Sequence, residues 1–342
     1  DPGVYFFETE TVKYILLLYV DDLVIAGPDI EWIKAFKEQV KEKFKIKDLG
    51  AATWLLGMEV TRDRAKRQLR LSQAKYINDL LSAYNMQDCN AAKVPMLPGS
   101  SVVVTGQNIL PNPKLYQSLV GSLLYAAVST RPDIVQAVSK LARVMSKPEE
   151  EHWVMAKRVL RYLKGKPDVG LTYTAGTTVT NQMEHATNAL IGYSDADWAG
   201  DLATRRSTTG YVFMLNGAAI SWNSKLQPTV ALSTAEAEYM AMCAAIQEGV
   251  FLRKLLHEVG FPQSSTPMLE DNQGCIALGN NPITSSRSKH IDIKYHFVRE
   301  MVNLKEFVLK YCPTDKMLAA PLTKPLPEER HNELCLMMQG HK

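Results

Sequence analysis

The chain has 342 residues, 46% hydrophobic and 22% charged, a composition typical of a globular protein of about two domains. Its formal net charge of +3 is compatible with nucleic-acid binding but does not by itself indicate it. The five scattered cysteines contain no CxxC pair, so we expect reduced, intracellular thiols rather than a disulfide framework or a zinc site. The longest apolar run near the start, residues 14–20, is too short to span a bilayer, and we expect no association with a membrane. The first residue is not Met, and we expect the chain to be part of a longer reading frame.

The first part of the chain is rich in strand-like segments. Residues 11–27 contain two apolar runs around a polar corner, which predicts a β-hairpin with Asp21 and Asp22 at its tip. Two aspartates are common in turns, so the pair alone says little about function. Apolar spacing and turn residues further predict a helix over 30–45, strands over 54–60 and 68–71, and a helix over 73–84 capped by Ser72.

The middle of the chain is predicted to be helical. Residues 89–114 are rich in Pro, Gly and Asn and should form a linker. Three amphipathic helices follow, over 115–128, 132–145 and 149–164. The third becomes basic towards its end, which either compensates the helix dipole or creates a phosphate-facing surface. A second polar linker is predicted over 174–188.

The last part of the chain alternates strands and helices. The predicted elements are strands over 190–194, 209–215 and 218–222, a helix over 233–259, a strand ending at Asp271, a helix over 293–304, a strand over 307–311, and a final helix from near Asp315. Three strands followed by helix, strand, helix, strand and helix is a mixed α/β order.

Three carboxylates stand at the ends of these predicted elements. Asp195 ends an apolar strand, Glu238 lies in the first turns of the long helix, and Asp271 ends the next strand. Each residue alone is readily explained as a cap, a turn or an exposed helix residue. Together they are what a two-metal nuclease requires, because Mg²⁺ takes hard oxygen ligands that converge from different elements.

The motifs around these carboxylates resemble the ribonuclease H domain of copia-type LTR retrotransposons. The segments that carry the resemblance are YSDADWAG, LSTAEAEY, EDNQ and KHIDIKYHFVRE. The resemblance implies Mg²⁺- or Mn²⁺-dependent cleavage of RNA in RNA–DNA hybrids, with Asp195, Glu238 and Asp271 as metal-binding catalytic residues. Glu238 is preferred over Glu236 because the family's catalytic glutamate precedes a bulky apolar residue and the body of the helix. HxDxxxH at residues 290–296 then belongs to a supporting helix rather than to a metal cluster.

The N-terminal hairpin carries a second resemblance, since LLLYVDDLVIAG is similar to the YVDD box of reverse transcriptases. Asp21 and Asp22 would be two of three polymerase metal ligands, and we expect the chain alone not to polymerise DNA. The implied fold is α+β and α/β: truncated reverse transcriptase palm, thumb and connection, then a ribonuclease H-like domain with a five-stranded mixed sheet flanked by helices. The implied domains are palm and thumb over 1–88, a linker over 89–114, a helical connection over 115–173, a linker over 174–188, and the ribonuclease H-like domain over 189–342.

One position departs from the family pattern. LAAPLTKPL places Ala320 where the family has a fourth metal-binding aspartate on the final helix, and alanine cannot coordinate a metal. Asp315 lies on another side of the predicted helix and fits a cap better. We therefore expect weakened hydrolysis. The alternative is a catalytically inactive or co-opted module that binds nucleic acid or protein.

The expected partners are an RNA–DNA hybrid or a template-primer, and the upstream part of the polyprotein or another copy of it. Hybrid recognition should use phosphates and 2′-hydroxyls. The candidate contacts are Arg205, Arg206, Asn272, Gln273 and Lys289. Trp198 and Trp222 could stack on substrate, although core packing is the better interpretation of Trp222. The expected location is intracellular, in a cytoplasmic particle or the nucleus.

Overall fold

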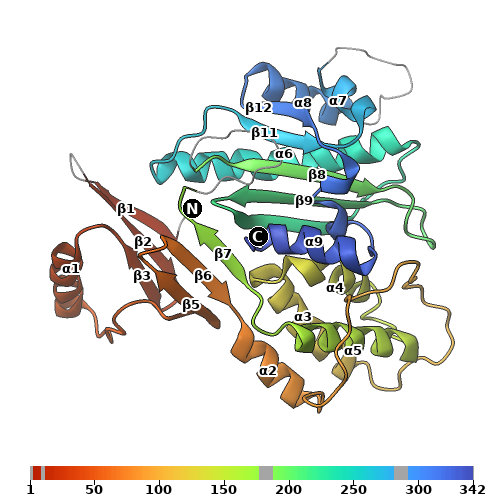
Figure 1. Ribbon diagram of the computed structural model, residues 1–342, viewed down its shortest axis with the longest axis horizontal. Helices are drawn as coiled ribbons and strands as arrows, with labels where there is room; N and C mark the ends of the chain where they lie inside the picture. Colours follow the sequence, from red (N-terminus) through yellow and green to blue (C-terminus); the bar gives the residue numbers. More distant parts are fainter. Residues whose placement is uncertain (1–2, 9–11, 177–187, 281–291, 342) are drawn as a thin grey trace.

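The computed structural model describes residues 3–8, 12–176, 188–280 and 292–341. These residues contain three β-sheets, with strand orders β1-β2-β3, β4-β5-β6-β7 and β10-β9-β8-β11-β12. Figure 1 shows the first sheet at one end of the molecule and the five-stranded sheet at the other, with a block of helices next to the latter.

The first sheet is an antiparallel meander that contains the predicted hairpin. Its strands are β1 (Val4–Glu8), β2 (Lys13–Tyr19) and β3 (Asp22–Ala26). Tyr19 pairs with Asp22, so Val20 and Asp21 form a two-residue turn, with Val20 at a φ of 55°. Helix α1 (Ile30–Lys43) follows, and the Asp29 side chain caps it. The hairpin and the helix are therefore confirmed.

The second sheet joins two distant parts of the chain. Its antiparallel strands are β4 (Trp54–Leu55), β5 (Met58–Asp63), β6 (Gln68–Ser72) and β7 (Leu171–Thr174). Helix α2 (Ala74–Ala83) begins directly after β6, and Ser72 Oγ accepts a hydrogen bond from Ala74 N at 3.2 Å. Strand β7 was not predicted, because it has four residues and its partner lies about a hundred positions earlier.

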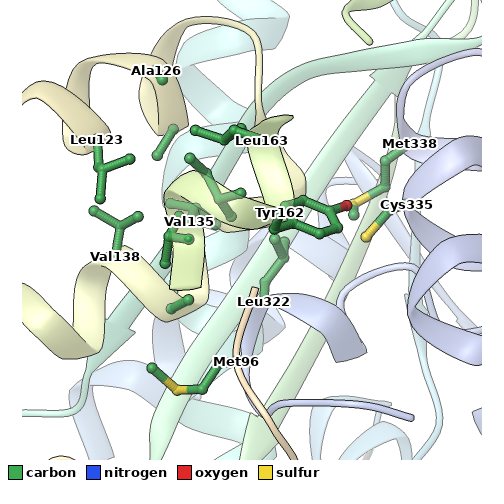
Figure 2. Packing of buried hydrophobic residues seen from close by; sticks show 14 of the residues in the cluster. Met96, Leu123, Ala126, Val135, Val138, Tyr162, Leu163, Leu322, Cys335 and Met338 are labelled. Carbon is green, nitrogen blue, oxygen red and sulfur yellow. The ribbon is translucent and has the colours of Figure 1, made fainter. Parts of the chain in front are cut away.

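The predicted three-helix region is present. It consists of α3 (Lys114–Ser129), the 3₁₀ turn η1 (Pro132–Ile134), α4 (Val135–Ala142) and α5 (Glu150–Gly165). Pro132 opens the 3₁₀ turn, as expected for a residue without an N–H. Figure 2 shows the core of this block, in which Leu123 and Tyr162 belong to one cluster with Leu322 and Met338 from the end of the chain. The helical block and the C-terminal segment therefore share a hydrophobic core.

A buried ion pair lies within the same region. Arg131 donates two hydrogen bonds to Asp133, from Nε at 3.0 Å and from Nη2 at 2.7 Å. The Tyr162 hydroxyl donates a third to Asp133 Oδ2 at 2.8 Å. The Tyr162 ring in turn contacts His331 edge to face, with the centroids 5.7 Å apart. The network therefore connects the 3₁₀ turn η1, helix α5 and the helix that contains His331.

The third sheet is the predicted five-stranded mixed sheet. Its strands are β8 (Ile191–Asp197), β9 (Thr208–Leu215), β10 (Ala218–Leu226), β11 (Thr266–Glu270) and β12 (Phe307–Tyr311). Strand β9 is antiparallel to both of its neighbours, β10 and β8, whereas β8, β11 and β12 are parallel. The long helix α6 (Thr234–Glu258) agrees with the helix predicted over 233–259. It packs on one face of the sheet against β8, β9 and β11. The opposite face, including Tyr193 and Val212, belongs to the core shared with the helical block.

The helices after β11 differ in part from the prediction. Helix α7 (Gln273–Asn280) was not predicted, since it is one short segment with two glycines. Helix α8 (Asp292–Asn303) agrees with the helix expected over 293–304 and includes Asp292 and His296 of the HxDxxxH motif. His290 lies outside the described residues.

The prediction of one continuous final helix from near Asp315 is wrong. The segment contains two 3₁₀ turns, η3 (Thr314–Lys316) and η4 (Ala320–Leu322), before helix α9 (Glu328–Met338). Proline cannot donate to the helical hydrogen-bond ladder and clashes with the preceding turn. Four prolines, at 313, 321, 325 and 327, interrupt this stretch.

Within the described ranges, no helix combines the length and the apolarity needed to cross a bilayer. All five cysteines are free thiols, and four of them are buried.

Candidate metal centre

The structure brings together Asp195, Glu238 and Asp271. One carboxylate oxygen from each lies within 4.8 Å of the others. Strands β8 and β11 are parallel neighbours, so the aspartates at their carboxyl ends meet at one edge of the sheet. Helix α6 packs against β8 and adds Glu238 from its second turn.

The geometry also separates the two glutamates of the AEAEY segment. Glu236 belongs to the start of α6, where its N–H donates to Ser233 Oγ at 3.2 Å and its Oε2 accepts from Leu232 N at 2.9 Å. Both bonds tie Glu236 to the residues that precede the helix. Glu238 instead belongs to the carboxylate group, and its buried Oε2 has no hydrogen-bond partner among the described residues.

The group is electrostatically unfavourable without a cation. Burial first, and then the charges of three neighbouring carboxylates, raise the pKa of Glu238 far above its ordinary value. Burial likewise raises the pKa of Asp195, which is 2% exposed. Lys324 supplies a positive charge that lowers both pKa values. Concentrated negative charge, hard oxygen donors and an unpartnered buried oxygen fit a divalent cation such as Mg²⁺.

Sequence reasoning missed a fourth carboxylate behind this group. Glu270 is fully buried, its Oε2 accepts a hydrogen bond from Ser194 Oγ at 2.9 Å, and burial raises its pKa well above the ordinary value. Its charge is the largest electrostatic contribution to the raised pKa of Glu238. An acidic residue that closes the apolar strand TPMLE was the signal available in the sequence.

The expected position of the family's fourth aspartate is occupied by a buried methyl group. Ala320, 1% exposed, is the first residue of η4 and belongs to the hydrophobic core. Asp315 is exposed in η3 and is not part of the carboxylate group. Three residues after Ala320, the Thr323 hydroxyl donates a hydrogen bond to Asp195 Oδ2. This contact, between residues 128 positions apart, was also not predicted.

A glycine allows the C-terminal segment to reach Asp195. Gly210 of β9 pairs directly with Asp195. A Cβ at Gly210 would lie 2.6 Å from Thr323 Cγ2 and 3.0 Å from Leu322 Cβ. The missing side chain therefore leaves the space in which the Thr323 hydroxyl meets the carboxylate.

The predicted nucleic-acid contacts lie in different settings. Arg205 and Arg206 belong to a turn after β8, in which Asp201 and Arg206 are joined by a backbone hydrogen bond of 3.1 Å. Asn272 caps α7, because its Oδ1 accepts from Cys275 N at 3.0 Å, and exposed Gln273 begins that helix. Lys289 lies outside the described residues. The roles of these five residues in nucleic-acid binding stay predictions.

The two tryptophans also differ. Trp222 packs against the shared core and donates to Ala127 O at 2.9 Å, as the packing interpretation required. Trp198 is 47% exposed and donates to Ala231 O at 3.1 Å. Asp21 and Asp22 are exposed at the tip of the first sheet, and the structure does not bring them into the carboxylate group.

Comparison with known proteins places the chain among transposon proteins. A family model described as reverse transcriptase (RNA-dependent DNA polymerase) matches residues 1–98. The retrovirus-related Pol polyprotein from transposon TNT 1-94 of Nicotiana tabacum is 40% identical over 99% of this chain, which spans 25% of that protein's length. A putative transposon Ty5-1 protein of Saccharomyces cerevisiae is 31% identical, and the match covers 72% of this chain and 78% of that protein.

Among solved structures, LC11-RNase H1, isolated from compost, aligns with 43% of this chain and 97% of its own, at 16% identity and a TM-score of 0.32. The relatives agree with the family indicated by the motifs around Asp21 and Asp195. The chain belongs to the family of Pol polyproteins of copia-type retrotransposons.

Proposed function

We propose that residues 189–342 form a ribonuclease H-type unit that cleaves the RNA strand of RNA–DNA hybrids with Mg²⁺ or Mn²⁺. The supporting observation is the convergence of Asp195, Glu238 and Asp271 from three separate elements. Glu238 Oε2 is the unpartnered buried oxygen within this carboxylate group, and it favours a missing partner because most buried polar atoms in proteins are hydrogen-bonded.

The chain's own residues have distinct tasks in this proposal. Bound divalent cations would activate water and stabilise the leaving oxygen at a phosphodiester. Asp195, Glu238 and Asp271 would hold them, and the Thr323 hydroxyl would orient Asp195 through its hydrogen bond. Lys324 adds positive charge near the same carboxylates, where a substrate phosphate would lie.

Ala320 limits the rate in this proposal and also favours a second candidate function. A site with three carboxylates holds its cations less firmly than one with four, so hydrolysis is weakened. If the deficit is complete, the unit is a module that binds nucleic acid without cutting it.

The remaining parts would derive from the polymerase. We propose palm and thumb for residues 1–88, the linker 89–114 and the helical connection 115–173, with Asp21 and Asp22 as two polymerase ligands. Residues 174–188 would link the connection to the ribonuclease H-type unit. Arg205, Arg206, Asn272 and Gln273 would touch the hybrid backbone.

The direct test is cleavage of an end-labelled RNA–DNA hybrid with and without Mg²⁺ or Mn²⁺. Asp195→Asn should abolish metal-dependent cutting. Glu238→Gln should do the same, whereas Glu236→Gln keeps an acceptor oxygen for the helix cap and should cut like the unaltered chain. Equal loss in the two glutamate variants would contradict the assignment of Glu238. Absence of all cutting, with hybrid binding retained, would establish the binding module.

The weakening attributed to Ala320 has its own test. Ala320→Asp should raise the cleavage rate by about tenfold or more, since even residues that only support metal ligands typically change activity by ~10–100-fold. Ala320→Asn adds nearly the same volume without the charge and should not raise it. An unaltered chain as fast as the Ala320→Asp variant would refute the idea, provided that both melt at similar temperatures.

A further inference from the structure

A cavity of about 290 Å³ lies between the helical block and the unit that carries the carboxylates. Its walls are the coil 99–103, the end of α4 with Lys140 and the C-cap residue Arg143, the end of β8 with the loop after it, and Lys324 with Pro325. The cavity adjoins the metal centre, because Asp197 follows Asp195 by two residues in β8, and Lys324 follows Thr323, which hydrogen-bonds to Asp195.

The cavity has more cationic than anionic side chains. Three cations, Lys140, Arg143 and Lys324, face two acids, Asp197 and Asp201. Arg143 and Asp201 pair with each other, since Asp201 Oδ2 accepts from Arg143 Nη1 at 3.2 Å, which leaves Lys140 and Lys324 against Asp197. The lining therefore favours an anion over a second cation.

Two donors in the cavity lack acceptors among the described residues. Arg143 Nη2 is buried without a hydrogen-bond partner. Lys140 is only 8% exposed and makes no ion pair within 4 Å in the described part of the chain. Burial lowers the pKa of this lysine, and Asp197 opposes that effect only at longer range. Buried donors are normally satisfied, so the unsatisfied Arg143 Nη2, beside a lysine that has no ion pair, favours an oxygen-rich ligand.

We propose that this cavity binds a backbone phosphate of the nucleic acid that enters the metal centre, so that α4 of the helical block supplies part of the substrate surface. The inference rests on the proposed function for the identity of the nucleic acid. Arginine and lysine donors are the usual partners of phosphate oxygens. Neither Lys140 nor Arg143 was among the nucleic-acid contacts predicted from the sequence.

The test is binding of a labelled RNA–DNA hybrid in Ca²⁺, measured by fluorescence anisotropy over a series of salt concentrations. Lys140→Met keeps the aliphatic stem and removes the charge, and Lys147→Met is the matched control on the exposed coil after α4. We expect Lys140→Met to weaken binding about tenfold, as for loss of one charge-assisted hydrogen bond. The slope of log K against log salt should fall by about one. Lys147→Met should change affinity less than about twofold.

Stability separates binding from a structural role. Lys140→Met removes a buried charge and should not lower the melting temperature, whereas loss of a structural lysine would lower it. Arg143→Lys keeps the charge next to Asp201 and removes Nη2, and it should weaken binding in the same direction. Excess inorganic phosphate should compete with the hybrid only weakly if the site takes a backbone phosphate.

The outcomes for the cavity and for catalysis are distinguishable, because binding is measured without turnover. Lys140→Met binding as tightly as Lys147→Met, or an unaltered chain that binds no hybrid, would overturn the inference. A chain that binds through Lys140 but never cuts supports the cavity and argues against the nuclease.

Discussion

Replacing Asp133 by alanine should destabilise the chain by about 3–5 kcal/mol, because it leaves the Arg131 guanidinium buried without its counter-charge. The side chains of Arg131 and Asp133 are 0% and 1% exposed, so water cannot replace the lost carboxylate. Arg131 cannot lose its charge by deprotonation, since arginine stays protonated in proteins. The Tyr162 hydroxyl would lose its acceptor as well.

The expected shift in melting temperature follows from chain size. At about 2.1 cal/mol/K of unfolding entropy per residue, 342 residues give roughly 0.7 kcal/mol/K if the chain unfolds as one unit. A loss of 3–5 kcal/mol then lowers the melting temperature by about 4–7 °C. Scanning calorimetry or circular dichroism would measure it.

Two further variants make the test specific. Glu31→Ala breaks an ion pair with Lys34 whose side chains are 73% and 63% exposed, and it should leave the melting temperature within about 1 °C. Replacing Arg131 by Met and Asp133 by Leu together should recover most of the loss, because no unpaired charge remains. An Asp133→Ala variant that melts like Glu31→Ala would refute the reasoning.

Three other predictions concern the centre itself. Thr323→Val keeps the volume but removes the hydroxyl that donates to Asp195, so calorimetric titration should show Mn²⁺ binding weakened by about tenfold or more; an unchanged Kd would count against it. Gly210→Ala should lower the free energy of unfolding by about 1–3 kcal/mol through overpacking. The control is Gly121→Ala in α3, where a Cβ meets nothing within 4 Å, and it should leave stability unchanged or raise it. Equal melting temperatures of the two variants would contradict this prediction. The raised pKa of Glu238 means that the folded chain holds a proton that the unfolded chain releases, so stability without metal should fall as the pH rises above about 5. The gain in melting temperature on adding Mg²⁺ should therefore grow between pH 5.5 and 8.5, and a gain independent of pH would be contrary to the prediction.

Elements with strong periodicity and local punctuation were predictable from the sequence. The long helix α6 is an example, because Ser233 marks its start and 25 residues of helix-compatible sequence follow. Strand β7 was not predictable, since its partner β6 lies about a hundred positions earlier in the chain. The 3₁₀ turns near Ala320 are held by local hydrogen bonds and were missed for a different reason. The four prolines after Tyr311 were visible, but they showed only where a helix should not continue.

The same distinction applies to the site. The sequence placed Asp195 and Asp271 at strand ends, and the two residues meet because β8 and β11 are parallel neighbours in the structure. The roles of these residues stay predictions. Thr323 was not predicted, because no local pattern indicates that a threonine contacts a carboxylate 128 positions away. Lys140 was not predicted, because no local pattern indicates that a lysine lines a cavity between two parts of the fold.

Strand β7 has a consequence for the order in which the molecule can be assembled. It pairs with β6 along Gln68–Leu71, and Thr172 N donates to Gln339 O at 2.9 Å. During synthesis, the edge of β6 must wait for about a hundred residues before β7 leaves the ribosome, and β7 must wait for the segment around Gln339. Such long-range closure is slow and leaves an unpaired edge exposed. A nascent chain should therefore keep the edge of β7 exposed until the segment around Gln339 has emerged.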